Sequence, residues 1–207
     1  MKHILSLLVI SIALVGCKNP GAEVTPATVE AAPEAEAKAA PSASVATLPI
    51  NPSNSKVEFV GAKVTASHPG GFTDFSGKLE LAEPVEKSQI QITIETASLF
   101  ADKEKLTKHL KSADFFDVEK YPNAEFRSTE IKKEGEGHVI TGDLTLHGVT
   151  KRISFPATVA VSDAQVQASS EFSINRKDFG INYPGMQDDL IRDLVVIKLS
   201  LALPRQG

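Results

Sequence analysis

The sequence predicts an all-β domain, an eight-stranded antiparallel β-barrel with one short helical crossover insert. Three observations carry this prediction. Apolar and polar residues alternate with period two from residue 51 onward, the connectors between alternating segments are short and polar, and only one segment has helical spacing. A parallel sheet would need a long crossover between each pair of strands, and the sequence has no room for them. Closure into a barrel would remove the exposed strand edges.

Eight segments show the alternation of half-buried strands. In the clearest of them, Ile90, Ile92 and Ile94 share one face and polar side chains share the other. The run from His68 to Gly71, with its Pro-Gly-Gly sequence, predicts a turn between the first two strands. The predicted strands are residues 56–64, 72–81, 89–98, 124–133, 138–147, 150–161, 165–176 and 193–203.

The insert lies between the third and fourth predicted strands. Asp102 is an acceptable N-cap, and Leu106 and Leu110 follow at helical spacing. Two adjacent aromatic rings, Phe115 and Phe116, then fall on a short turn, and Pro122 excludes helix from the residue before it. An aromatic-rich crossover of this kind is expected to cover an apolar interior.

The N-terminus is predicted to be a lipoprotein signal peptide, residues 1–16. A short basic start precedes about a dozen apolar residues, too few to span a bilayer, and small residues precede the single cysteine, Cys17. Cys17 is the expected lipidation site, and several acyl chains on one residue anchor a protein stably. Lys18 follows in place of an aspartate, which favours the outer membrane. The chain is therefore expected to be an exported, periplasm-facing, outer-membrane lipoprotein; the alternative is a soluble secreted protein with an incidental cysteine.

Residues 17–48 are predicted to form a disordered tether. They are rich in Ala, Pro and Glu and almost free of aromatic and long aliphatic side chains, so they bury too little surface to offset the entropy of ordering. The folded domain is predicted to be residues 49–207. It contains no cysteine, so burial and backbone pairing alone must stabilise it.

Composition and motifs exclude several classes of function. The net charge of −4 and the scattered basic residues leave no footprint for a nucleic acid. No nucleophile elbow, phosphate-binding glycine loop or histidine pair at metal-ligand spacing occurs. We therefore predict no catalytic residue, no metal site, no covalent cofactor in the domain and no enzymatic activity.

Two polar residues fall at positions where a barrel ligand could be bound. His147, before Gly148, is either part of a tight hairpin turn or a rim residue that contacts a ligand head group. Arg176 shares a strand face with Phe172 and Ile174, so it is expected to point inward and must then be paired. Either it forms a structural ion pair, with Asp178, Asp188, Asp189 and Asp193 as candidate partners, or it contacts the head group.

Four segments together resemble the YceI-like polyisoprenoid-binding family. They are HLKSADFFDVEKYPNAEFRS (109–128), GDLTLHGVTK (142–151), FSINRKDFGI (172–181) and DLVVIKL (193–199), and the resemblance extends over about residues 48–203. It implies a lipocalin-like barrel with an elongated apolar cavity that binds an isoprenoid quinone or a polyprenyl compound. Many members are exported and some look dimeric. The lipidation site and the tether depart from the family pattern and indicate a membrane-anchored carrier or storage protein.

The expected binding site is apolar. Small inward residues (Ala157, Ala168, Ser170 and Ser200) and the absence of tryptophan leave room for a ligand. The alternative is a filled barrel that serves as a tethered protein–protein interaction module in the cell envelope. The residues expected to line or cap the cavity are Phe59, Phe72, Phe75, Ile92, Ile94, Leu99, Phe115, Phe116, Phe126, Phe155, Phe172 and Ile174.

Overall fold

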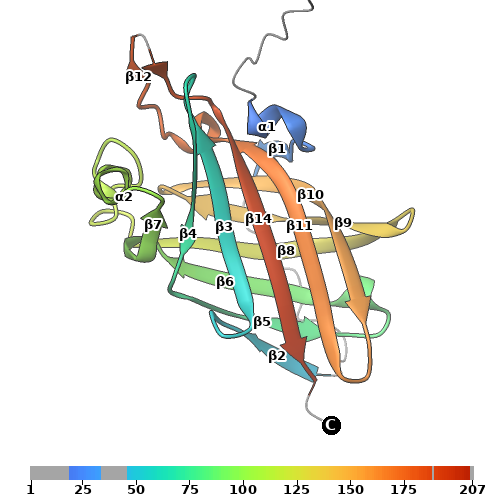
Figure 1. The fold of residues 1–207 in the computed structure, drawn as a ribbon. Coiled ribbons are helices and arrows are strands. Elements are labelled where there is room, and N and C mark those ends of the chain that lie inside the picture. Colours follow the sequence, from blue (N-terminus) through green and yellow to red (C-terminus); the bar gives the residue numbers. More distant parts are fainter. Residues whose placement is uncertain (1–18, 34–45, 188, 206–207) are drawn as a thin grey trace, which may run out of the picture.

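The computed structural model describes residues 19–33, 46–187 and 189–205. Most of them form one 12-stranded antiparallel sheet with the order β2-β5-β6-β8-β9-β10-β11-β14-β3-β4-β7, and β1 is attached to β10. Figure 1 shows the sheet strongly curled, with β3, β4, β11 and β14 crossing in front of β5, β6 and β8. The strands are β1 (Thr28–Ala31), β2 (Ala46–Ile50), β3 (Ser55–Ala62), β4 (Ser67–Phe72), β5 (Phe75–Leu81), β6 (Gln89–Glu95), β7 (Leu99–Ala101), β8 (Asn123–Glu134), β9 (Gly137–Leu146), β10 (Val149–Val161), β11 (Gln165–Asn175), β12 (Gly185–Met186), β13 (Asp189–Leu190) and β14 (Leu194–Pro204).

The antiparallel all-β prediction is confirmed. The eight predicted strands correspond to β3, β5, β6, β8, β9, β10, β11 and β14, and the structure adds several shorter strands to them. Within the described residues the path of paired strands ends at β2 and β7, so the sheet forms a curled half-barrel with two edges. The helices are α1 (Pro20–Glu23) and α2 (Glu104–Lys111), with 3₁₀ turns η1 (Val85–Lys87), η2 (Thr96–Ser98) and η3 (Arg176–Phe179). None of them, among these described residues, is long and apolar enough to cross a bilayer.

The segment predicted as a turn at His68–Gly71 belongs to a strand, β4, which pairs with β3 and β7. Glycine is needed there because of close packing. A Cβ atom on Gly70 would lie 2.3 Å from the carbonyl oxygen of Phe100 and 2.5 Å from the ring of Phe59. The glycines that resemble turn residues in the sequence therefore let a neighbouring strand and an aromatic ring approach the backbone.

Helix α2 forms in the predicted insert but begins differently. Its N-cap is Lys103, without a side-chain capping bond, and the carboxylate of Asp102 instead lies 3.0 Å from Nδ1 of His68 on β4. The helix is thus tied to the sheet edge through β7, and Thr107 also accepts a hydrogen bond from the backbone N–H of Ala101.

The N-terminal segment differs from the expected disordered tether. Residues 25–31 lie in a split of the sheet, because β10 pairs with β11 only over Thr158–Val161 and pairs with β1 further along. On the β11 side, the backbone N–H of Ala27 donates to the carbonyl of Ser173, whose own N–H donates to Thr25. Residues 19–31 therefore belong to the folded domain. Residues 34–45, in the rest of the predicted tether, and Cys17 lie outside the described residues.

The hydrophobic core fills only part of the half-barrel. Its fully buried members include Ile50, Leu81, Val166 and Leu203, which lie on β2, β5, β11 and β14. Of the small residues expected to point inward, Ser200 is exposed, since the inward positions of β14 are the odd-numbered ones. The opposite part of the interior, beneath α2, is hollow.

Candidate functional site

A cavity of about 950 Å³ lies between the inner face of the sheet and the segments that cap it. Its wall is formed by side chains of β3, β4, β6, β8, β9, β11 and β14, and its cap by α2, the turn after it and side chains from residues 181–186 and 189–192. This volume is at the upper end of the range for small-molecule sites. Because most of the wall is aliphatic or aromatic, the cavity suits an apolar ligand of considerable size.

Side chains from three adjacent strands form the centre of the cavity wall. Phe172 on β11 lies opposite Ile197 on β14, and Ile197 lies opposite Phe59 on β3. Directly opposed residues project to the same face of a sheet, and all three line the cavity. Phe155 stacks on Phe172, with ring centroids 4.2 Å apart and planes 9° apart. Both rings belong to the core, and Phe172 alone of the two lines the cavity.

Aromatic contacts join the cap to the wall. Phe116 packs edge-to-face on Phe72 of β4, with centroids 6.0 Å apart. His109 of α2 lies 5.0 Å from the rings of both Phe115 and Tyr183. Phe115 is buried although it lies on a turn, because these rings enclose it. The cap is therefore held by ring packing between α2 and the segment that follows η3.

The structure brings together seven of the predicted apolar residues around the cavity: Phe59, Phe72, Ile94, Phe115, Phe116, Phe172 and Ile174. The other five lie elsewhere. Phe75, Ile92 and Phe155 belong to the packed core, Phe126 packs against it, and Leu99 is buried beside Phe72 on the edge strand β7. An inward face in a half-filled barrel serves both core and cavity, and alternation alone does not distinguish the two.

Several lining residues were missed by sequence reasoning. Those on strands, among them Val57, Leu144 and Ile197, had a signal, since they occupy inward positions of predicted strands. Those in the segment after η3, among them Tyr183 and Ile191, had none, because irregular backbone carries no periodicity.

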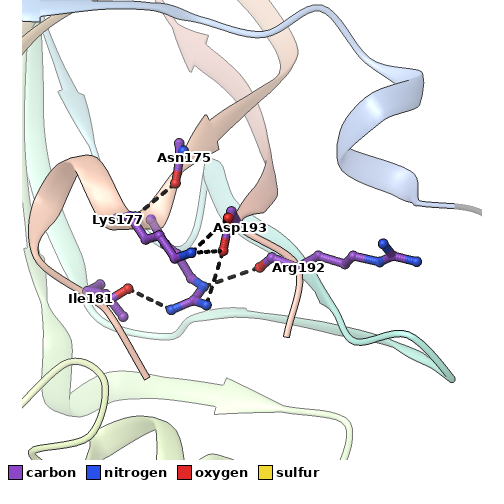
Figure 2. A network of polar contacts seen from close by, with 6 residues as sticks. Asn175, Lys177, Ile181, Arg192 and Asp193 are labelled. Carbon is purple, nitrogen blue, oxygen red and sulfur yellow. Dashed lines mark hydrogen bonds and ion pairs between the residues drawn. The ribbon is translucent and has the colours of Figure 1, made fainter. Parts of the chain in front are cut away.

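Arg176 is a structural residue at the cavity's edge. It is 5% exposed. Its guanidinium donates to the carbonyl of Ile181 at 2.6 Å, the carbonyl of Arg192 at 3.2 Å and the carboxylate of Asp193 at 3.3 Å. Figure 2 shows these acceptors around the group, with Lys177 also reaching Asp193. Burial lowers the pKa of Arg176, and Asp193 opposes that shift. These partners leave the structural ion pair as the better account of Arg176.

His147 lies outside the cavity lining. It has a φ of 52° and Gly148 a φ of 75°, so the two residues form the tight hairpin turn between β9 and β10. Its ring packs on Tyr121 with centroids 4.4 Å apart, and Nδ1 lies 3.3 Å from the carbonyl oxygen of Phe179. The head-group role expected for His147 is therefore not supported by its position.

Charged side chains border the cavity on its capped side. Lys63 of the segment after β3 pairs with Asp189 of β13. Lys103, Lys105 and Lys108 also border the cavity, and they are exposed. In the described ranges no three His, Cys, Asp or Glu side chains are grouped so that they could hold a metal ion.

Comparison with known sequences agrees with this geometry. The family profile described as YceI-like domain matches residues 48–203. A UPF0312 protein of Pseudomonas putida (strain W619) is 42% identical over 125 residues, 56% of this chain and 65% of that protein. One from Photorhabdus laumondii is 51% identical over 86 residues, 41% of this chain and 44% of that protein. The chain thus spans less than two thirds of the length of these relatives.

Comparison with solved structures supports the same fold. The crystal structure of Burkholderia cenocepacia BcnA has a TM-score of 0.64 and 27% identity, with 72% of this chain and 95% of that one covered. A polyisoprenoid binding domain from Saccharophagus degradans, implicated in plant cell wall breakdown, has a TM-score of 0.62 over 77% of this chain and 98% of that one. At 16% identity, the second likeness shows the fold alone.

Proposed function

The chain belongs to the YceI-like family, and from this premise we propose that it binds a long apolar isoprenoid lipid in the cavity beneath α2. The ligand is an isoprenoid quinone or a polyprenyl compound, and the protein acts as a membrane-anchored carrier or storage protein. The observation that carries the proposal is the cavity of about 950 Å³ with its aliphatic and aromatic wall. That the fold relative from Saccharophagus degradans is described as a polyisoprenoid binding domain agrees with it.

The energetics of such a ligand are favourable. A long isoprenoid chain offers several hundred Å² of apolar surface, and burial at about 25 cal/mol per Å² contributes on the order of 10 kcal/mol before other terms. Ordering the flexible chain offsets part of this gain. The proposal requires no catalytic group, because transfer of apolar surface out of water is itself the driving force.

The membrane anchor is part of the proposal. It rests on the apolar stretch and small residues before Cys17. Acylation of Cys17 would hold the carrier at the membrane from which an isoprenoid must come, since such lipids have negligible solubility in water. Mass spectrometry of the N-terminal peptide is expected to show a mass increase by a diacylglycerol and an acyl chain. An unmodified Cys17 would contradict the proposed anchor.

The cavity also bears on the alternative function. A tethered interaction module was expected to have a barrel filled by its own side chains, and here only one part of the half-barrel is filled. We therefore place ligand binding first.

Ligand extraction tests the proposal. The full-length chain is purified from membranes of a quinone-producing host, its mass is measured under native conditions, and the organic extract is analysed. We expect a reproducible mass excess that the extract identifies as one isoprenoid per chain. A chain without extra mass, which also fails to take up added quinone or polyprenol, would contradict the proposal.

A further inference from the structure

Three exposed apolar side chains form a projection at one end of the molecule, which we call the apolar tip: Val64, Met186 and Leu190. Their exposed fractions are 40%, 72% and 49%. The backbone holds them together, because the N–H of Val64 donates to the carbonyl of Leu190 at 3.0 Å and Met186 of β12 pairs with Asp189 of β13. Large exposed apolar side chains grouped in this way mark a surface that contacts another phase or molecule.

The apolar tip lies at the mouth of the cavity. Met186, Asp189 and Ile191 all line the cavity, so the tip and the ligand site share a wall. The same mouth is bordered by α2, whose lysines Lys105 and Lys108 are exposed. Tyr183, just before the tip, contacts His109 of α2 and connects the two parts. An apolar projection therefore stands beside a cationic helix at the opening.

The N-terminal end of the described chain lies at the same end of the molecule as the apolar tip. Helix α1 packs on Leu194, where a Cβ atom on Gly21 would lie 2.5 Å from the Cβ of Leu194. Arg192 and Val195, on either side of Leu194, line the cavity. Figure 1 shows α1 and β12 at the same end of the molecule. The described chain thus begins, at Asn19, at the same end of the molecule as the apolar tip.

We propose that this end of the molecule is a membrane-docking face. The apolar tip enters the interfacial layer of the bilayer, and Lys103, Lys105 and Lys108 contact lipid phosphates. The inference rests on the proposed function, since it uses the anchor on Cys17 and the lipid-binding cavity. Apolar side chains combined with lysines are the pattern by which proteins bind anionic bilayer surfaces. Docked in this way, the mouth opens toward the bilayer and an isoprenoid can move between the two without crossing bulk water.

The absence of tryptophan from the chain allows a direct test. Met186→Trp places a single fluorophore on the tip. Val161→Trp, at another exposed apolar position, is the matched control, since Val161 ends β10 at the opposite end of the molecule. The full-length proteins are reconstituted with vesicles of phosphatidylethanolamine and phosphatidylglycerol, with and without brominated acyl chains. We expect a blue shift and quenching for Met186→Trp and neither for Val161→Trp.

A charge variant tests the cationic part of the face. Replacing Lys103 and Lys105 by alanine is expected to reduce the quenching of Met186→Trp, with weakening on the order of fivefold per lysine at low salt. Replacing Lys132 and Lys133, which are exposed on β8 away from the mouth, is expected to leave it unchanged.

Several outcomes would overturn the docking face. They are equal emission and quenching of the two tryptophans, a chain that does not sediment with vesicles, or a blue shift of Met186→Trp before vesicles are added, which would assign the tip to self-association. These results are separable from the ligand proposal. A bound isoprenoid without quenching would support the proposed function and contradict the docking face. Quenching without a bound isoprenoid would support the docking face and contradict the proposed function.

Discussion

At the residue scale, single side chains stabilise the irregular segments at the edge of the cavity. Arg176 shows this best, because its guanidinium satisfies two backbone carbonyls and a carboxylate where η3 meets the start of β14. The sequence predicts that Arg176 points inward, as it does. It could not predict the acceptors, because the carbonyls of Ile181 and Arg192 belong to irregular segments whose placement no periodicity specifies.

The first prediction concerns Arg176. Arg176→Leu is expected to lower the free energy of unfolding by about 3 kcal/mol, since it leaves the buried carbonyl of Ile181, the partly buried carbonyl of Arg192 and the carboxylate of Asp193 without this donor. Lys177→Leu is the control, because Lys177 is exposed and contacts the same carboxylate; a change below about 1 kcal/mol is expected. Urea denaturation measures both. Unchanged stability of Arg176→Leu with loss of bound lipid would indicate a head-group role instead.

The second prediction concerns pH. The ammonium of Lys63 and the hydroxyl of Thr65 hold the pKa of Asp189 below its ordinary value. A depressed pKa stabilises the folded state at pH values above the unfolded pKa of about 4, and the stabilisation is lost as the pH falls through the folded pKa. The stability difference between the wild type and Asp189→Asn is therefore expected to be constant above about pH 5 and to shrink in more acidic solution. A difference that is equal at pH 3 and pH 7 would contradict this.

At the scale of elements, the long strands were predictable from the sequence, and the short strands β1 and β4 were not. Alternation located β6 and β14 because one face of each packs inward. It missed β4, whose glycines accommodate Phe59 and the backbone of β7. It also missed β1, whose short, Ala- and Pro-flanked sequence has no periodicity and is ordered only because a split between β10 and β11 offers unpaired backbone groups.

The third prediction follows from that split. A chain that begins at Ala46 is expected to lose about 2–4 kcal/mol of stability relative to one that begins at Asn19. It lacks the two hydrogen bonds to Ser173, at roughly 1 kcal/mol each, and the packing of Val29 against the core. Hydrogen exchange provides the local measurement. The amide of Ser173 should lose protection, and the amides of Thr158–Val161, which pair with β11, should keep theirs. Equal protection of Ser173 in both chains would show that β1 is dispensable.

At the scale of the whole molecule, a curled sheet is filled by its own core in one part and hollow in the other. The sequence predicted the curled antiparallel sheet, the crossover insert and the apolar interior of this arrangement. The division between core and cavity depends on which aromatic rings reach the hollow part: Phe59, Phe72 and Phe172 line the cavity, whereas Phe155 and Phe126 do not. Phe172 also belongs to the core cluster, so it lies at the boundary between the two. That division depends on strand curvature and register together, and neither can be obtained from the alternation of single strands.

One pair of variants tests the central claim, that the cavity beneath α2 holds the lipid. Ile197 lies between Phe59 and Phe172 in the wall, so Ile197→Trp should obstruct the cavity. Ser200→Trp, on the same strand but exposed, is the control. The measurement is the amount of isoprenoid per chain by native mass spectrometry after purification from the same host. We predict at least a tenfold loss for Ile197→Trp, with both variants folded by circular dichroism and Ser200→Trp like the wild type. Wild-type lipid content in a folded Ile197→Trp protein would contradict the account.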